Sequence, residues 1–156
     1  MGLDVISSLE SKQHDYTNQI SGLNRKIKEC ERAYESLLAF KNMVIRSQDN
    51  FHAINQSKNS VLGEIEGVKR NSRTAQKYHT GMQKIFSGFG SKLVGIVFVT
   101  LLSSIAVQLT AYTNKIIAYE SDIDSYTNKI AKLDDQIKEA EKTKAVVDAV
   151  LKGGVV

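Results

Sequence analysis

Hydrophobic residues recur through the first part of the chain at alternating intervals of three and four residues. This spacing places them along one face of a helix, while the residues between them, such as Arg25, Lys26 and Glu29, are mostly charged. The twelve successive positions, of which ten are apolar, are Ile6, Leu9, Gln13, Tyr16, Ile20, Leu23, Ile27, Cys30, Tyr34, Leu37, Lys41 and Val44. The pattern predicts a long coiled-coil-like helix, and we call this face the first seam.

The same spacing begins again at Leu102 and holds for seven heptads. The fifteen positions, of which fourteen are apolar, are Leu102, Ile105, Leu109, Tyr112, Ile116, Tyr119, Ile123, Tyr126, Ile130, Leu133, Ile137, Ala140, Lys144, Val147 and Leu151. A pattern this long predicts a second helix that packs against a partner helix along its length, and we call this face the second seam.

Two stretches between the seams weaken the helical pattern. Residues 55–60 are polar and are followed by Gly63 and Gly67, each of which lowers helix stability by about 1 kcal/mol relative to alanine, so we expect a kink or a short break near 47–63. Residues 87–91, Ser-Gly-Phe-Gly-Ser, contain two glycines and a serine that can cap a helix, which is typical of a turn.

The absence of proline favours long helices everywhere else, because proline is the residue that most often breaks a helix. The sequence therefore predicts an all-α fold, either a long antiparallel helical hairpin or an elongated coiled-coil-like bundle. We expect one helical domain over residues 1–156, with an N-terminal arm at 4–86, a turn at 87–91 and a C-terminal helix at 92–151.

A short motif, Tyr-Thr-Asn-x-Ile, occurs three times, at residues 16–20, 112–116 and 126–130. Helices with heptad repeats draw on few residue types, so we interpret these copies as convergent composition rather than as a duplicated helix.

The net charge of +4 is concentrated in one part of the chain, because residues 51–92 alone have a net charge of +5. The basic residues there include Lys69, Arg73 and Lys77, but no nucleic-acid-binding motif accompanies them. We expect a solvated basic surface, a secondary candidate for partner binding, and no nucleic-acid partner.

The sequence contains no pattern that indicates catalysis, a cofactor or a metal. His14, His52 and His79 have no metal-ligand spacing, and no glycine-rich phosphate-binding loop is present. The single cysteine, Cys30, lies on the first seam, where a cysteine is usually a small buried hydrophobic residue. We therefore expect a protein that is not an enzyme.

One segment is apolar on all sides. Residues 93–114 contain no charge over 22 positions and are bounded by Lys92 and Lys115, a length that just suffices to cross a bilayer. Its hydroxyl and amide side chains and its continuity with the second seam favour burial by protein, which a single neighbouring helix cannot supply. Cover from the chain's own middle region, around Phe51, Ile54, Val61, Leu62, Ile65, Val68, Ile85 and Phe86, is one alternative, and a second copy or another protein are the others. The candidate partner-binding residues are Leu93, Ile96, Val97, Val99, Leu101, Val107, Ile123 and Ile130.

The chain is similar to a known protein family in four features. These are residues 40–51, residues 71–82, the heptad pattern of the N-terminal arm and the isoleucine-rich C-terminal helix. It resembles the WXG-type helical accessory proteins of type VII secretion, which are encoded beside LXG-type toxins of Gram-positive bacteria. The Trp-x-Gly turn and the Tyr-x-x-x-Asp/Glu export motif of that family are absent, so the likeness does not extend to self-export. It implies a non-enzymatic partner, a chaperone or targeting factor, that binds the helical region of a toxin or a second accessory subunit.

Two other classes remain open on the sequence. A membrane-active protein would insert residues 93–114, and a structural coiled coil would assemble as a homo-oligomer. Residues 1–6 carry an early acid and lack a basic stretch before an apolar core, so we expect no secretory signal peptide, synthesis in the cytoplasm, and any export in company with a partner.

Replacing Ile123 or Ile130 by aspartate should unfold or disassemble the protein, because an unpaired charge in a desolvated seam costs several kcal/mol. Replacing Lys132 or Glu139, which the register places outside the seam, should change the free energy of unfolding by less than about 0.5 kcal/mol. Thermal melts followed by circular dichroism measure both, and equal effects at the two kinds of position contradict the register.

Overall fold

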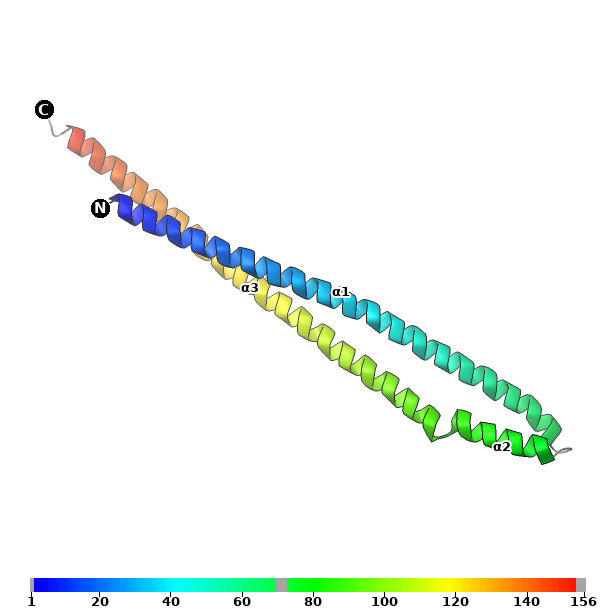
Figure 1. Ribbon diagram of the computed structural model, residues 1–156. Helices are drawn as coiled ribbons and strands as arrows, with labels where there is room; N and C mark the ends of the chain where they lie inside the picture. The colour runs from blue at the N-terminus through cyan, green and yellow to red at the C-terminus, as the bar shows by residue number, and fades with distance from the viewer. Residues whose placement is uncertain (1, 70–72, 154–156) are drawn as a thin grey trace. The chain divides into compact units, whose positions relative to one another are not determined.

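Three helices form an all-α helical hairpin in the computed structural model, which describes residues 2–69 and 73–153 (Figure 1). The helices are α1 (Gly2–Lys69), α2 (Arg73–Ser87) and α3 (Phe89–Gly153), and no described residue lies in a strand. Side chains are described except for those of residue 2 and of residues 65–69, 75, 85–87 and 89. Helices α1 and α3 pack against each other, so the predicted fold class is confirmed.

The first seam lies where the spacing predicts. All twelve of its positions are buried or half-buried, with Ile27 and Val44 among the most buried side chains described. The charged residues between them, such as Lys28 and Glu31, are exposed. The heptad pattern of α1 therefore records its contact with α3.

Thirteen of the fifteen positions of the second seam are likewise buried or half-buried, and the exceptions are Val147 and Leu151. A groove of about 490 Å³ places Leu3 and Val5 of α1 beside residues 140–148 of α3. Val147 lines this groove and is 49% exposed, and Leu151 is 65% exposed.

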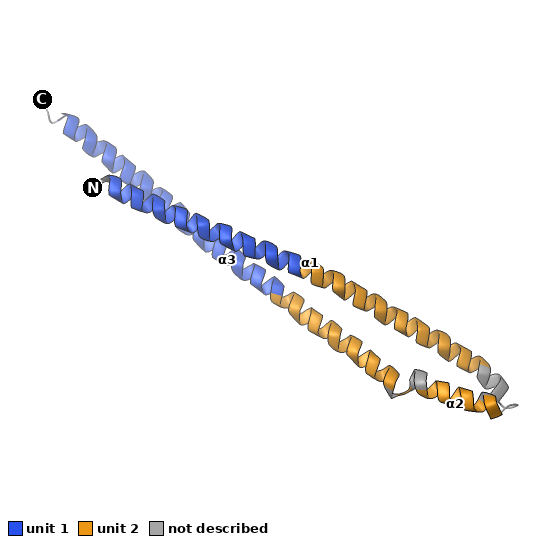
Figure 2. Ribbon diagram, in the orientation of Figure 1, with its two compact units in different colours: residues 1–33, 112–156 blue, residues 34–111 orange. Residues whose placement is uncertain are grey.

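The contacts divide the chain into two compact units, coloured separately in Figure 2. Unit 1 comprises residues 1–33 and 112–156, and unit 2 comprises residues 34–111. The single domain expected from the sequence thus contains two units, each of which includes a part of α1 and a part of α3.

In unit 1, aromatic and polar contacts accompany the apolar seam. The rings of Tyr16 and Tyr126 lie 5.5 Å apart, and the Lys129 ammonium lies over both rings, 5.6 and 5.2 Å from their centroids. The Gln13 amide donates hydrogen bonds to the Ile130 carbonyl (3.3 Å) and to the Asp134 carboxylate (2.6 Å). These contacts fix one register, because a shifted pairing separates the donors from their acceptors.

Unit 2 has a small apolar core. Val44 of α1 and Ile105 and Leu109 of α3 are buried together. The partly buried side chains packed against them are Tyr34, Leu37, Phe98, Leu101 and Leu102. Nearer to α2, the Phe51 ring lies 6.0 Å from that of Phe98, and the Asn55 amide donates a hydrogen bond of 3.1 Å to the Ser91 hydroxyl.

Helix α1 continues without a break through residues 47–63, where the polar run and the glycine pointed to a kink. The contacts of Phe51 and Asn55 with α3 and the burial of Leu62 stabilise the helix there. They outweigh the cost of about 1 kcal/mol at Gly63.

The position of the main reversal differs from the prediction. Figure 1 shows α2 already on the returning side of the hairpin, so the chain has changed direction by Arg73. The predicted turn at 87–91 is instead a one-residue break between α2 and α3, at Gly88. The predicted arm at 4–86 accordingly contains two helices, and residues 70–72 lie outside the described residues.

The break at Gly88 requires glycine for a steric reason. A Cβ atom at this position would clash with the carbonyl oxygen of Lys84, whereas a Cβ at Gly90 would meet nothing within 4 Å. The Gly88 carbonyl also accepts a hydrogen bond of 3.3 Å from the backbone amide of Lys92, which helps to start α3.

The two glycines of this segment should therefore respond differently to substitution by alanine. Gly88→Ala should lower the free energy of unfolding by about 1 to 3 kcal/mol because the backbone must shift. Gly90→Ala should be neutral or stabilise by up to about 1 kcal/mol through helix propensity. Urea denaturation of both variants measures the difference, and a tolerated alanine at Gly88 contradicts the described break.

Candidate protein-binding surface

The uncharged segment of α3 presents most of its candidate residues to solvent. Leu93, Ile96, Val97, Val99 and Val107 are exposed. The other three candidates are half-buried, Leu101 against the core of unit 2 and Ile123 and Ile130 on the second seam of unit 1. The structure therefore brings five of the eight predicted residues to one exposed part of α3.

The exposed residues of α3 follow a heptad pattern of their own, separate from the positions of the second seam. Its positions, spaced by three and four residues, are Leu93, Ile96, Thr100, Ser103, Val107 and Thr110, and all six are exposed. We call this face the outer seam. Val97 and Val99 flank it on its two sides, since each lies about 100° around the helix from the neighbouring residue.

The described side chains of the chain's middle region do not cover the outer seam. Phe51 packs against Phe98, on the side of α3 that faces α1, while Ile54 and Val61 are themselves exposed. Leu62 is buried, and the side chains of Ile65, Val68, Ile85 and Phe86 lie outside the described ones.

Sequence reasoning missed an apolar contribution from α1. Phe40, Met43, Ile54 and Val61 are exposed, and three of them, Phe40, Ile54 and Val61, are separated by multiples of seven residues. This spacing places those three on one side of α1, a signal that the more regular first seam obscures. Exposed apolar side chains of unit 2 therefore come from both long helices.

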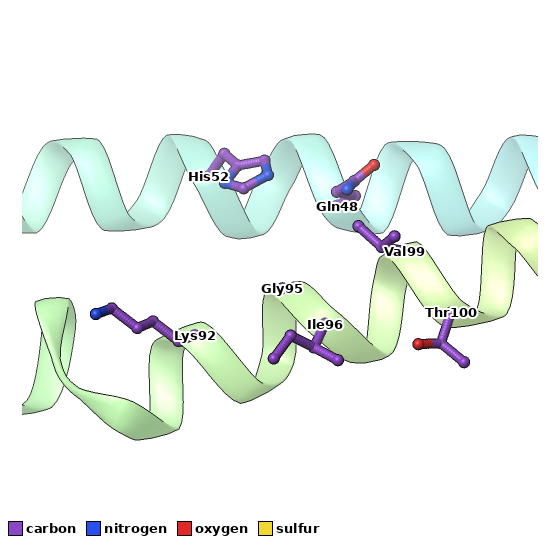
Figure 3. A pocket seen from close by; sticks show the side chains of 7 residues that line it. All are labelled: Gln48, His52, Lys92, Gly95, Ile96, Val99 and Thr100. Atoms are coloured by element: carbon purple, nitrogen blue, oxygen red, sulfur yellow. The ribbon is translucent and has the colours of Figure 1, made fainter.

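A shallow groove of about 460 Å³ runs between α1 and α3 in unit 2 (Figure 3). Its lining residues are Gln48 and His52 of α1 and Lys92, Gly95, Ile96, Val99 and Thr100 of α3. In Figure 3 the side chain of Val99 points toward Gln48 on α1, and the side chain of Lys92 lies at one end of the groove. None of the described side chains that line the groove is acidic.

The charge of unit 2 is strongly basic. Residues 34–111 contain nine Lys and Arg and four Asp and Glu, a net charge of +5, whereas the rest of the chain contains twelve and thirteen, a net charge of −1. Of the predicted secondary basic surface, Arg73 and Lys77 are exposed on α2, and the Lys69 side chain lies outside the described ones.

The most apolar part of α3 is long enough to cross a membrane by length and composition alone. Its most apolar window of 18 residues has a mean hydropathy of 2.2, and 11% of that window is buried within the protein. A core helix of a soluble protein would be mostly buried, so the low burial shows that the described hairpin leaves most of this segment uncovered.

The histidines and the cysteine are not gathered into one site. His14 is exposed and lies within hydrogen-bonding distance of Asn18 (3.2 Å), His79 is buried in α2, and Cys30 is half-buried on the first seam. Among the described residues, no group of three or more His, Cys, Asp or Glu side chains is placed to hold a metal ion.

Comparison with known protein families, with curated proteins and with solved structures finds no match.

Two neighbouring positions on α3 should separate hairpin stability from the exposed surface. Ile105 is 4% exposed and Val107 is 69% exposed. Ile105→Ala should lower the free energy of unfolding by about 2 to 5 kcal/mol, as expected for a buried isoleucine. Val107→Ala should change it by less than about 0.5 kcal/mol. Urea titrations of the two variants test this, and a large loss at Val107 means that the protein itself covers the outer seam.

Proposed function

We propose that the protein is a non-enzymatic helical binding partner. In this role it pairs with the helical region of a secreted LXG-type toxin and helps to deliver it to a type VII secretion machine. The observation that carries the proposal is the exposed apolar surface of α3 between Leu93 and Thr110, which the hairpin leaves uncovered.

An exposed apolar surface of this extent is typical of a binding site. Monomeric soluble proteins rarely expose large contiguous apolar patches. Burying Ile96, Val97, Val99 and Val107 in an interface contributes about 1.5 to 3 kcal/mol for each side chain before the entropic costs of association. Burial of this surface would therefore contribute favourably to the free energy of binding a partner.

The outer seam favours a helix as the partner. Its residues repeat at the intervals with which one helix packs against another, and Thr100 and Ser103 at its centre are small enough to allow close approach. The Thr110 hydroxyl donates a hydrogen bond of 3.0 Å to the carbonyl of Ala106, so this polar group is already satisfied when the face is buried.

The resemblance to WXG-type accessory proteins supplies the identity of the proposed partner. In that family the partner is the helical region of an LXG-type toxin, sometimes with a second accessory subunit. Helices of the toxin that lie beside the hairpin would cover the outer seam, as neighbouring helices do in a helical bundle. Cytoplasmic synthesis, with export only alongside the toxin, fits this role.

Membrane insertion of residues 93–114 is a second candidate function, and the low burial of the apolar window favours it. Insertion must remove Ile105 and Leu109 from their core with Val44, which makes it the more costly alternative. Flotation with phosphatidylglycerol vesicles distinguishes the two functions, because a protein-binding hairpin stays in the soluble fraction. A structural homo-oligomer would instead give one discrete assembly of the pure protein by light scattering.

A matched pair of valines tests the proposed function. Val97, in the exposed surface of unit 2, and Val146, near the end of α3 in unit 1, are both 62% exposed. Val97→Asp should abolish co-purification with the helical region of an LXG-type toxin, because burying an unpaired carboxylate costs several kcal/mol. Val146→Asp should leave co-purification unchanged.

Circular dichroism of both variants should match the unsubstituted protein, since neither side chain contributes to the seams. Capture that survives Val97→Asp, or that is lost equally in both variants, contradicts the assignment of the binding surface. Leu101→Lys should also abolish capture, but its half-buried position makes loss of folding a second cause that the dichroism must exclude.

A further inference from the structure

We propose that the groove between α1 and α3 in unit 2 receives an acidic amphipathic helix, one whose apolar side chains are flanked by carboxylates. This inference rests on the proposed function and specifies the chemistry of the partner helix. It combines the open floor of the groove at Gly95, the basic and hydrogen-bonding character of its rim, and the net charge of unit 2.

The floor of the groove leaves room for an incoming side chain. Gly95 has no Cβ, and a Cβ built there would meet nothing within 4 Å. Ile96 and Val99 stand beside it as exposed apolar walls. A side chain that projects from a helix can enter such a gap between larger residues, as a knob enters a hole in a coiled coil.

The rim of the groove selects the charge of the partner. Lys92 contributes a cation, and His52, Gln48 and Thr100 contribute groups that can donate hydrogen bonds. Carboxylates on the partner would be stabilised by these groups, while lysine or arginine would meet Lys92 and the net charge of +5 of unit 2. The same charge disfavours a second copy of unit 2 as the occupant.

Contacts beneath and beside the groove hold its rim in place. The His52 ring lies 6.0 Å from the ring of Phe51, which in turn packs against Phe98 of α3. The hydrogen bond between Asn55 and Ser91 ties the two helices together beside Lys92. A groove that is already formed loses less conformational freedom on binding, which favours its use as a docking site.

Filling the groove at Gly95 tests the proposed location. The probe is the purified helical region of an LXG-type toxin, titrated against the full-length protein by calorimetry. Gly95→Leu should weaken binding at least about tenfold, because the new side chain occupies the space of the incoming one. Gly63→Leu is the control, since a Cβ there also meets nothing within 4 Å and Gly63 lies outside the groove, and it should change the dissociation constant by less than about twofold.

Reversing the charge at the rim tests the proposed chemistry. Lys92→Glu should weaken binding about fivefold or more at low salt, with a smaller effect in 0.5 M salt, whereas Lys132→Glu in unit 1 should have little effect. Both proteins should keep the helical content of the unsubstituted chain by circular dichroism.

The outcomes separate this inference from the proposed function. If the unsubstituted protein binds the toxin region and Gly95→Leu binds it equally well, the groove is wrong and the function stands. Stronger binding by Lys92→Glu overturns the acidic character of the partner. If the unsubstituted protein does not bind the helical region of the toxin, both the proposed function and the groove assignment fail. The same holds if the protein inserts into phosphatidylglycerol vesicles instead of binding the toxin.

Discussion

Among the described residues, each long helix of this hairpin packs against one other long helix, and the rest of the structure depends on that constraint. Pairing α1 with α3 buries one face of each helix and leaves the remaining faces to solvent. In unit 1 the solvent faces carry charged pairs such as Glu139 and Lys142, whose charged groups lie 3.5 Å apart, beside exposed apolar side chains such as Ile117 and Val146. In unit 2 the solvent face of α3 is apolar between Leu93 and Val107. The hairpin alone does not bury that face, so the proposed function includes a partner that covers it.

The two units differ in the contacts that they contain. Unit 1 contains specific contacts, such as the hydrogen bonds of Gln13 and the tilted ring contact of Tyr16 with Tyr126, that fix how α1 pairs with α3. Unit 2 has a small core around Val44 and Ile105, and its outer apolar side chains contribute little to the stability of the hairpin. These exposed apolar side chains favour aggregation of a free monomer. They are available for binding a partner because the fold does not depend on them.

Much of this fold could be predicted from the sequence, because heptad spacing directly records which face of a helix is buried. The seam positions from Ile6 to Val44 and from Leu102 to Lys144 all lie where the spacing placed them. The exposure of Val147 and Leu151 could not be predicted, since heptad spacing indicates which face of a helix is apolar but not how far along the helix its neighbour packs. The reversal was misplaced because Gly88 and Gly90 resemble a turn, whereas only Gly88 is held to glycine by the nearby Lys84 carbonyl.

The candidate surface was only partly predictable for a related reason. An uncharged segment such as 93–114 shows that something must cover it, but the sequence does not show which side chains the hairpin itself buries. The structure separates Leu101, packed against the core, from Val97 and Val99, which are exposed. It also adds Phe40 and Met43 of α1, whose spacing is overshadowed by the first seam. The groove at Gly95 requires both helices and could not be read from either one alone.

Cysteine labelling at Val107 tests the central claim most directly. In a variant with Cys30→Ser and Val107→Cys, a water-soluble maleimide should react rapidly with the free protein, because this position faces solvent on the outer seam. Once the helical region of the toxin is bound, the reaction should slow by at least about tenfold, since a buried thiol is inaccessible to the reagent. A thiol already protected in the free monomer, or one that reacts equally fast in the complex, contradicts the claim that a helical partner covers this face.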